Sequence, residues 1–154
     1  MEPNWLSTDR VPAEILLADG AALGGSLHLQ PRVAHRDGGE TPLEMLNRPE
    51  HFFPVTTAEG GVVFVSKAQV ALVRIAPGPA TAEMPEEQLG REVGLEVTMQ
   101  GGTVRRGSAR ILLPPTRTRA LDYVNSTDLF FALRGQEGLL LIGRTHVRLV
   151  RPLD

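Results

Sequence analysis

The chain has 154 residues, of which 42% are hydrophobic and 22% charged, and its formal net charge is −2 at pH 7. This composition is ordinary for a globular protein and too apolar for a disordered chain. Cysteine is absent, which excludes disulfides, thiolate metal sites and cysteine nucleophiles. The apolar runs are far shorter than the ~20 residues of a membrane-spanning helix. No secretory signal pattern is recognisable, so we expect a cytoplasmic protein, although the lack of cysteine leaves an envelope location open.

Residues 9–75 contain five short apolar segments separated by turn residues. Strands are therefore expected at residues 14–18, 21–29, 51–57, 62–66 and 70–75. Gly24 and Gly25 lie within the second segment and predict a bulge or a sharp bend, because glycine tolerates strained torsions. Thr41 and Pro42 favour the start of a short helical turn between the second and third strands.

Residues 76–91 are rich in proline and glutamate, which predicts a linker. Residues 92–154 then follow the plan of the first half. Further strands are expected near residues 94–100, 103–112, 128–134, 138–143 and 147–151, with a helical turn at residues 119–125. Acidic residues exceed basic ones before residue 76, and the reverse holds after residue 91, so the two halves carry opposite net charge.

The two halves share sequence in five blocks that recur in the same order. Block by block, Val11–Ile15 matches Val93–Val97, Gly20 and Gly25-Ser26 match Gly102 and Gly107-Ser108, Leu43–Asn47 matches Leu121–Asn125, Phe52-Phe53 matches Phe130-Phe131, and Val62–Arg74 matches Leu139–Arg151. Chance explains one matched block, but five in order indicate a tandem duplication.

Each half is about 65 residues long, a size at which a single hydrophobic core is only marginally stable. The two units are therefore expected to pack on each other or on another chain. We predict a mainly β protein of two tandem five-stranded small barrels at residues 9–75 and 92–154, joined by the linker at 76–91. Each barrel would have a short helical turn between its second and third strands.

Two motifs in each half resemble those of the Sm-like (LSm/Hfq) fold. Gly20…Gly25-Ser26-Leu27 and Gly102…Gly107-Ser108-Ala109 are similar to its first motif, and Val63–Val73 and Leu140–Val150 to its second. The Leu-x-x-Leu-Asn block followed by Phe-Phe also resembles an uncharacterised bacterial domain family. The resemblance covers nearly all of both units and implies small β-barrels in a protein of bacterial type.

The residues with which Sm-like proteins bind RNA are not matched. Their Asp-x-x-x-Asn segment is replaced by Gln30–Arg32 in one unit and Leu112–Pro114 in the other. The basic residue of the second motif is displaced by one position, to Lys67 and Arg144. The resemblance therefore does not imply the usual nucleobase pocket.

Five arginines of the second half have no acidic residue among them, namely Arg105, Arg106, Arg110, Arg117 and Arg119. They make RNA or polyanion binding the alternative function, because arginine binds phosphate through paired hydrogen bonds. The competing explanation is a solvated strand face that balances the acidic first half. Aromatic residues for base stacking are few. Four phenylalanines recur at matching places, which suits a core: Phe52, Phe53, Phe130 and Phe131.

The remaining polar candidates favour structural roles. His28, His35, His51 and His146 lack the spacing of a metal site and have no histidine counterparts, so we interpret them as incidental surface residues. The recurring pairs are Asn47 with Asn125, expected to cap helical turns, and Glu14 with Glu96, expected to pair locally or across the unit interface. No phosphate-binding loop or hydrolase motif is present. No catalytic residue, metal or cofactor is therefore expected.

We accordingly predict a non-enzymatic protein-interaction or scaffold module, a subunit of a larger assembly, that acts by edge-strand pairing or surface docking. The expected contacts lie in the two loops that differ between the units, residues 32–40 and 114–118. They comprise Arg32, His35, Arg36, Pro114 and Pro115. A protein partner is expected, and whether the chain forms a homo-oligomer is left open.

Overall fold

The computed structural model describes residues 8–31, 39–78, 90–111, 120–126 and 128–153. Within these ranges, ten antiparallel strands form one open sheet, which confirms the predicted mainly β class. The strands are β1 (Asp9–Leu17), β2 (Ala22–Leu29), β3 (Phe52–Thr57), β4 (Val62–Ser66), β5 (Val70–Ile75), β6 (Arg91–Met99), β7 (Val104–Ile111), β8 (Phe130–Gly135), β9 (Gly138–Gly143) and β10 (Val147–Leu153).

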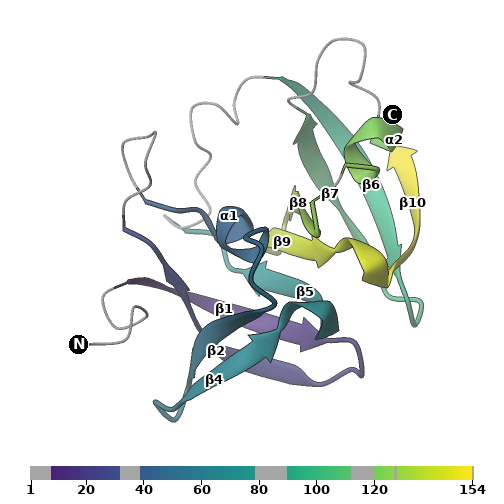
Figure 1. The fold of residues 1–154 in the computed structure, drawn as a ribbon. Helices are drawn as coiled ribbons and strands as arrows, with labels where there is room; N and C mark the ends of the chain where they lie inside the picture. The colour runs from purple at the N-terminus through teal and green to yellow at the C-terminus, as the bar shows by residue number, and fades with distance from the viewer. Residues whose placement is uncertain (1–7, 32–38, 79–89, 112–119, 127, 154) are drawn as a thin grey trace.

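The two halves of the chain have the same strand order. The first half runs β5-β1-β2-β3-β4 across the sheet and the second runs β10-β6-β7-β8-β9. The halves are joined where β5 pairs antiparallel with β9, with Val73 opposite Leu141. Figure 1 shows two strongly curved halves that meet at β5 and β9, with β4 at the lower end of the molecule and β10 at the upper right. The sheet therefore ends in β4 on one side and in β10 on the other.

A glycine in the second strand of each half allows close approach to the third strand. A Cβ atom added to Gly25 would lie 2.4 Å from the carbonyl oxygen of Thr56 in β3. One added to Gly107 would lie 2.5 Å from the carbonyl oxygen of Arg134 in β8. Because β1 and β2 pair residue by residue through this region, Gly25 marks a close backbone contact and not a bulge.

Short helices lie at matching places in the two halves: α1 (Pro42–Leu46) between β2 and β3, and α2 (Ala120–Val124) between β7 and β8. A capping box begins α1, in which the Thr41 hydroxyl accepts from the Glu44 N–H and the Glu44 carboxylate accepts from the Thr41 N–H. Matching 3-10 turns, η2 (Lys67–Gln69) and η6 (Arg144–His146), connect the last two strands of each half.

The first strand of each half is longer than the sequence predicts. β1 begins at Asp9 instead of residue 14, and β6 begins at Arg91 instead of residue 94. Proline has no N–H for a ladder, and Pro12 lies where β1 pairs with β2 alone, because β5 pairs with β1 only from Glu14 onward.

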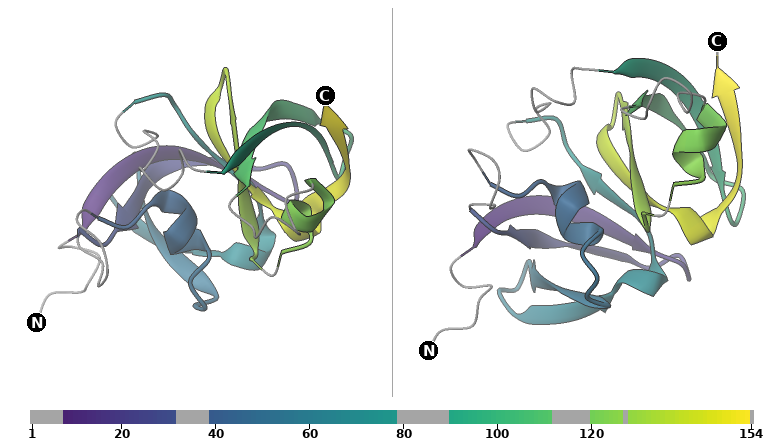
Figure 2. Two further views of the ribbon diagram at one scale, coloured as in Figure 1. Left: turned by 90° about the horizontal axis from the view of Figure 1, so that it is seen from above. Right: turned by 45° about the horizontal axis from the view of Figure 1, so that its top comes forward.

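Two hydrophobic clusters form the interior, and β8 and β9 contribute to both. Successive residues of a strand point to opposite faces. One face of β8 and β9 therefore enters the cluster of the first half, through Phe130, Leu139 and Leu141. The other face enters the cluster of the second half, through Phe131, Leu133, Leu140 and Ile142. Figure 2 shows the junction of the two halves, where β5 pairs with β9, from two further directions.

Polar contacts also fasten the two halves together. The Asn47 side chain accepts a hydrogen bond from the Phe130 N–H (2.9 Å) and donates one to the Phe130 carbonyl oxygen (3.2 Å). His146 Nε2 donates to the carbonyl oxygen of Ala68 at 2.7 Å. Asn47 was expected only to cap its helix; in addition, its side chain binds the other half of the chain. Among the described residues, no helix is long and apolar enough to cross a membrane.

Candidate functional site

Three of the five predicted polyanion-binding arginines lie on β7, and each is ion-paired. Arg105 contacts Glu137 at 2.9 Å, Arg106 contacts Glu96 at 2.6 Å and Arg110 contacts Glu92 at 2.9 Å. No acidic residue lies between these arginines in the sequence, but Glu92 and Glu96 of the neighbouring strand β6 and Glu137 of the β8–β9 turn pair with them. Arg117 and Arg119 lie outside the described residues. RNA or polyanion binding at these arginines stays a prediction.

The predicted partner-binding loops are not described by the structure. Arg32, His35, Arg36, Pro114 and Pro115 all lie outside the described ranges. At the end of the first loop, Glu40 is buried and accepts two hydrogen bonds from Arg48. Glu40 therefore holds the loop end against the residues that follow α1.

His28 is not a surface residue, so that prediction is wrong. It is buried in β2, with Nδ1 2.8 Å from the Thr8 hydroxyl and Nε2 2.8 Å from the Thr56 hydroxyl. Leu27 and Leu29 enter the core, so strand alternation places His28 on the opposite face, where the hydroxyls of Thr8 and Thr56 satisfy its ring nitrogens. In the described parts of the chain, no three histidine, aspartate or glutamate side chains are grouped as a metal site would require.

Glu14 and Glu96 pair within their own halves, which is the local alternative left open above. Glu14 contacts Arg74 at 3.2 Å, and Glu96 contacts Arg151 at 2.9 Å. Arg74 and Arg151 occupy matching places in the repeat. These pairs tie the first strand of each half to the last.

Lys67 and Arg144, the displaced basic residues of the second motif, also match each other in position and role. Lys67 Nζ donates to the carbonyl oxygens of Arg48 (2.8 Å) and Met45 (3.4 Å), at the end of α1. Arg144 Nε donates to the Val124 carbonyl oxygen (2.7 Å), at the end of α2. Burial lowers the pKa of both groups, since it disfavours the charged form. Both side chains satisfy carbonyls that a helix end leaves without partners.

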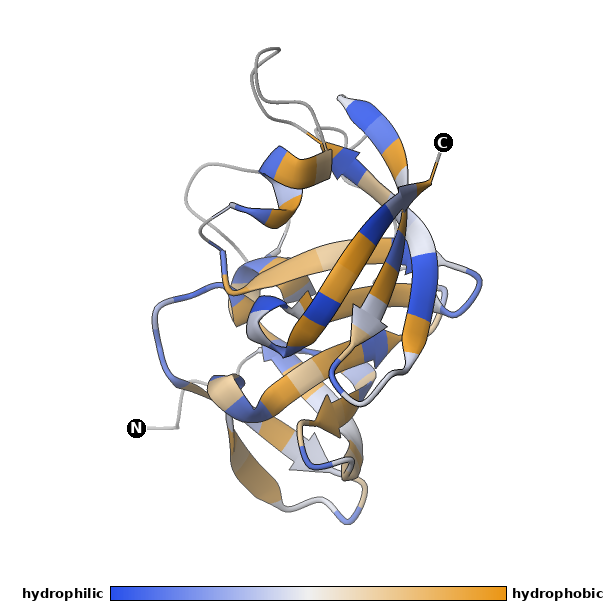
Figure 3. Cartoon of the chain, turned by 90° about the vertical axis from the view of Figure 1, so that its right-hand side faces the viewer, coloured by the Kyte–Doolittle hydropathy of each residue, from blue (hydrophilic) through white to orange (hydrophobic). Residues whose placement is uncertain are grey.

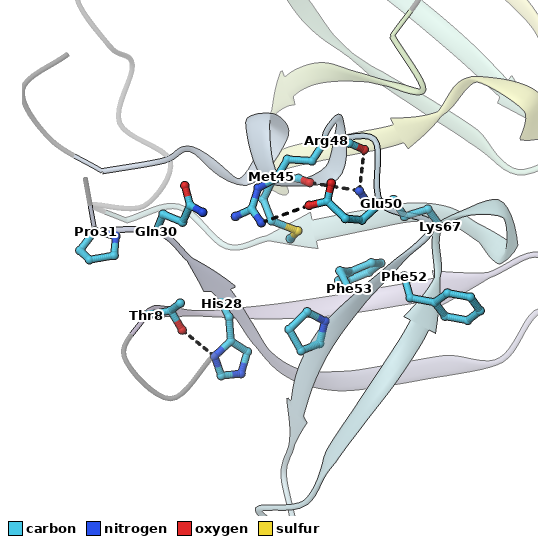
Figure 4. Close-up of a pocket in the computed structure, with 11 residues that line it drawn as sticks. Thr8, His28, Gln30, Pro31, Met45, Arg48, Glu50, Phe52, Phe53 and Lys67 are labelled. Atoms are coloured by element: carbon cyan, nitrogen blue, oxygen red, sulfur yellow. Dashed lines mark hydrogen bonds and ion pairs between the residues drawn. The ribbon is translucent and has the colours of Figure 1, made fainter. Parts of the chain in front are cut away.

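A pocket of about 510 Å³ lies in the first half, between the end of β2, α1 and the start of β3. Figure 4 shows Arg48, Glu50 and Lys67 gathered on one side of it and His28 on the other, with Phe52 at the rim. Its lining residues are Thr8, His28, Gln30, Pro31, Met45, Arg48, Glu50, Phe52, Phe53, Pro54 and Lys67.

The charged groups of this pocket are engaged by other parts of the protein. Arg48 is held by Glu40, whose hydrogen bond is the main cause of the raised pKa of Arg48, and it also lies 3.8 Å from Glu50. Lys67 is bound to backbone carbonyls, as described above. Met45, Phe53 and Pro54 supply an apolar wall. This arrangement suits the binding of an apolar side chain against the apolar wall, with the charged residues of the pocket at its rim.

The second half has Tyr123 at the place of Met45. Its hydroxyl donates to the Ala132 carbonyl oxygen (3.0 Å) and accepts from the Ala132 N–H (3.2 Å). The Tyr123 ring meets Phe131 edge-on at 5.9 Å, and Arg144 lies over the same ring at 5.4 Å. Burial raises the pKa of Tyr123. Met45 of the pocket wall is thus replaced in the second half by a tyrosine whose hydroxyl is bonded to the backbone of β8.

Beside the pocket, the open edge of the sheet exposes large apolar side chains. Phe52 of β3 and Phe64 of β4 are 58% and 62% exposed, and Val62 and Val63 of β4 are also exposed. The prediction that all four recurring phenylalanines lie in the core is wrong for Phe52 and right for the other three. The apolar sequence of β4 is nearly as continuous as that of β9, a strand that is buried from Leu139 to Gly143. We refer to β4 together with Phe52 as the β4 edge.

No known protein family, curated protein or solved structure matches the chain.

Proposed function

We propose that this protein is a non-enzymatic interaction or scaffold module, a subunit of a larger assembly, which binds a protein partner at the β4 edge. The observation that carries the proposal is the exposure of Phe52 and Phe64 side by side on the last strands of the sheet. Phe64 stands opposite Pro54, two residues from Phe52, so the two rings share one face. Large exposed apolar side chains at a sheet edge are typical of interaction sites.

Edge-strand pairing is the proposed mechanism. A partner strand would extend the backbone ladder beyond β4 and cover the exposed face. The neighbouring pocket suits an apolar side chain of the partner, since Met45 and Phe53 line it and its charges are already engaged. We also propose that each half is a small barrel of Sm-like type. The shared strand order and the matching glycine contacts at Gly25 and Gly107 support this proposal.

Site-specific photo-crosslinking in the source organism tests the proposal. Phe64 is replaced by the photoreactive analogue benzoylphenylalanine, which is close to it in shape. The control carries the same analogue at Val104, which is also exposed but lies on β7, between two paired strands. We expect protein adducts from position 64 and few from position 104. Adducts with nucleic acid alone would favour the polyanion alternative and overturn the proposal, as would the absence of adducts at position 64.

A further inference from the structure

The sequence of β4 suits a strand that is covered on both faces. Val62–Ser66 matches Leu139–Gly143 of β9 in the repeat, and both segments are almost wholly apolar. A continuous apolar run is typical of a strand buried on both faces. β9 meets this condition, because it lies between β8 and β5 and feeds two clusters. β4 has a described strand, β3, on one side only.

Matching side chains have opposite exposure at the two places. Phe130 and Leu141 are 2% and 0% exposed, because they pack into the cluster of the first half. Their counterparts Phe52 and Phe64 are the exposed residues of the β4 edge. The first half thus presents to the outside the surface that the second half buries at the internal junction.

The opposite end of the molecule presents the complementary surface. Leu149 of β10 is 51% exposed, whereas its counterpart Leu72 of β5 is 2% exposed at the junction. An apolar groove of about 240 Å³ lies between α2 and β10. Its lining residues are Ala120, Leu121, Val124, Val150 and Pro152. We refer to β10 and this groove as the β10 edge. The side of the molecule that carries β10 faces the viewer in Figure 3.

The groove has a filled counterpart at the internal junction. Leu46 of α1 and Val73 of β5 match Val124 and Val150 of the groove. In the first half, these two residues belong to the cluster that holds Phe130 and Leu141. The α2–β10 groove is therefore the counterpart of the place where one half receives the other.

We propose that the chain assembles head to tail with further copies of itself, the β4 edge of one copy pairing with the β10 edge of the next. This inference rests on the proposed function and names the partner as a second copy. The internal β5–β9 junction supplies the register, which places Phe64 opposite Val150 and Val63 opposite Arg151. The two edges lie at opposite ends of the molecule (Figure 1), so their pairing joins different chains. The contact is heterologous, because it joins two different surfaces. An assembly of any length therefore keeps one free β4 edge at one end and one free β10 edge at the other.

Two further features fit this arrangement. The half that carries the β4 edge has excess acidic residues and the half that carries the β10 edge has excess basic ones, which favours their contact. Asn125 is exposed and matches Asn47, whose side chain holds both backbone groups of Phe130. In the assembly, Asn125 binds the backbone of Phe52 in the next copy.

One residue shortens the expected ladder. Pro152 stands at the place of Ile75, whose carbonyl oxygen is directed at Gly138 in the neighbouring β9. Proline has no N–H to donate. The N–H and C=O of one strand residue point to the same side, so Pro152 would offer the next copy a carbonyl oxygen and no donor.

Light scattering during size-exclusion chromatography of the purified full chain tests the assembly. We expect the mass of two or more 16.7 kDa chains. Phe64→Lys and Leu149→Lys should each reduce the measured mass to that of one chain, because a lysine at either edge blocks pairing. Val104→Lys, a substitution at an exposed apolar residue away from both edges, should retain the mass of the unaltered protein.

Mixing the two blocked variants gives the sharpest test. The Phe64→Lys chain keeps an intact β10 edge and the Leu149→Lys chain an intact β4 edge. We therefore expect the mixture to form a complex of one copy of each and nothing larger. A Leu149→Lys protein that stays dimeric alone would indicate pairing of β4 with β4 and overturn the head-to-tail contact. A monomeric unaltered protein, or a mixture of folded variants that does not associate, would overturn it too.

Asn125→Ala tests the same contact with a smaller change, because it removes only an exposed side chain. It should weaken association by ~10-fold, the effect of losing the hydrogen bonds of one side chain. Unchanged association would contradict the proposed register. If the purified protein is monomeric but position 64 still crosslinks to a different protein in cells, the self-assembly fails while the proposed function stands.

Discussion

A single methyl group at Gly25 would meet the backbone of the next strand. We expect Gly25→Ala to lower the free energy of unfolding by about 1–3 kcal/mol, the usual effect of forcing an atom into a packed site. The added Cβ would lie 2.4 Å from the Thr56 carbonyl oxygen, whereas one added to Gly24 has no atom within 4 Å. Urea unfolding of both variants measures the difference. Equal losses for Gly24→Ala and Gly25→Ala would contradict the proposed reason for the glycine.

The stability of the second half should depend on the charge of Glu96. Hydrogen bonds from Arg151 and then Arg106 hold the pKa of this carboxyl below its ordinary value. The folded state therefore favours the ionised form. The resulting stability is complete above the unfolded-state pKa of roughly 4.3, and it is lost as pH falls through the lower folded-state pKa.

Glu96→Gln removes this titration. We expect its unfolding free energy to decline less between pH 5 and pH 2 than that of the unaltered protein. Urea unfolding at a series of pH values measures both curves, and parallel curves would show that the two ion pairs contribute nothing to folding.

At the scale of elements, β9 and β4 show how one sequence pattern takes two roles. Both are continuous apolar strands, but β9 lies between two strands and β4 at the end of the sheet. The same substitution at matching places should therefore have different consequences.

Leu141→Ala should lower the unfolding free energy by about 2–5 kcal/mol, because it leaves a cavity in a buried cluster. Phe64→Ala, at the matching exposed place, should change the unfolding free energy of dilute protein by less than about 0.5 kcal/mol. Chemical denaturation at low protein concentration compares the two. A large loss for Phe64→Ala in a monomeric sample would mean that Phe64 serves the fold of its own chain.

At the scale of the whole molecule, self-assembly would couple stability to concentration. Association that involves only the folded state raises apparent stability by mass action. We expect the thermal midpoint of the unaltered protein to rise with protein concentration and that of Phe64→Lys to stay constant. Calorimetry or circular dichroism over a hundredfold concentration range measures this. A midpoint independent of concentration in both proteins would argue against the assembly.

Several features of the fold were predictable from local sequence. Turn glycines and short apolar segments marked the strand positions, because these signals depend on only a few neighbouring residues. Thr41 and Pro42 likewise marked the start of α1. The predicted start of β1 at residue 14 was too late, since β1 continues back to Asp9 through Pro12, where it pairs with β2 alone.

The candidate site was much less predictable. His28 was assigned to the surface and Phe52 to the core, and both assignments are wrong. The arginines of β7 seemed unopposed along the chain, yet Glu92 and Glu96 face two of them from β6. Each of these outcomes depends on a neighbour that is distant in sequence.

The sequence by itself determined the mainly β class, the positions of the turns and the matched blocks of the two halves, because short-range periodicity and internal similarity are visible in one chain. Only the tertiary structure decided which apolar strand is covered. β9 pairs with β5 on the side away from β8, whereas β4 has no described strand on the side away from β3. The physical reason is that burial of a strand is decided by pairing between segments far apart in the chain, whereas its side-chain pattern is local. For that reason two nearly equivalent strands became an internal junction and an open edge.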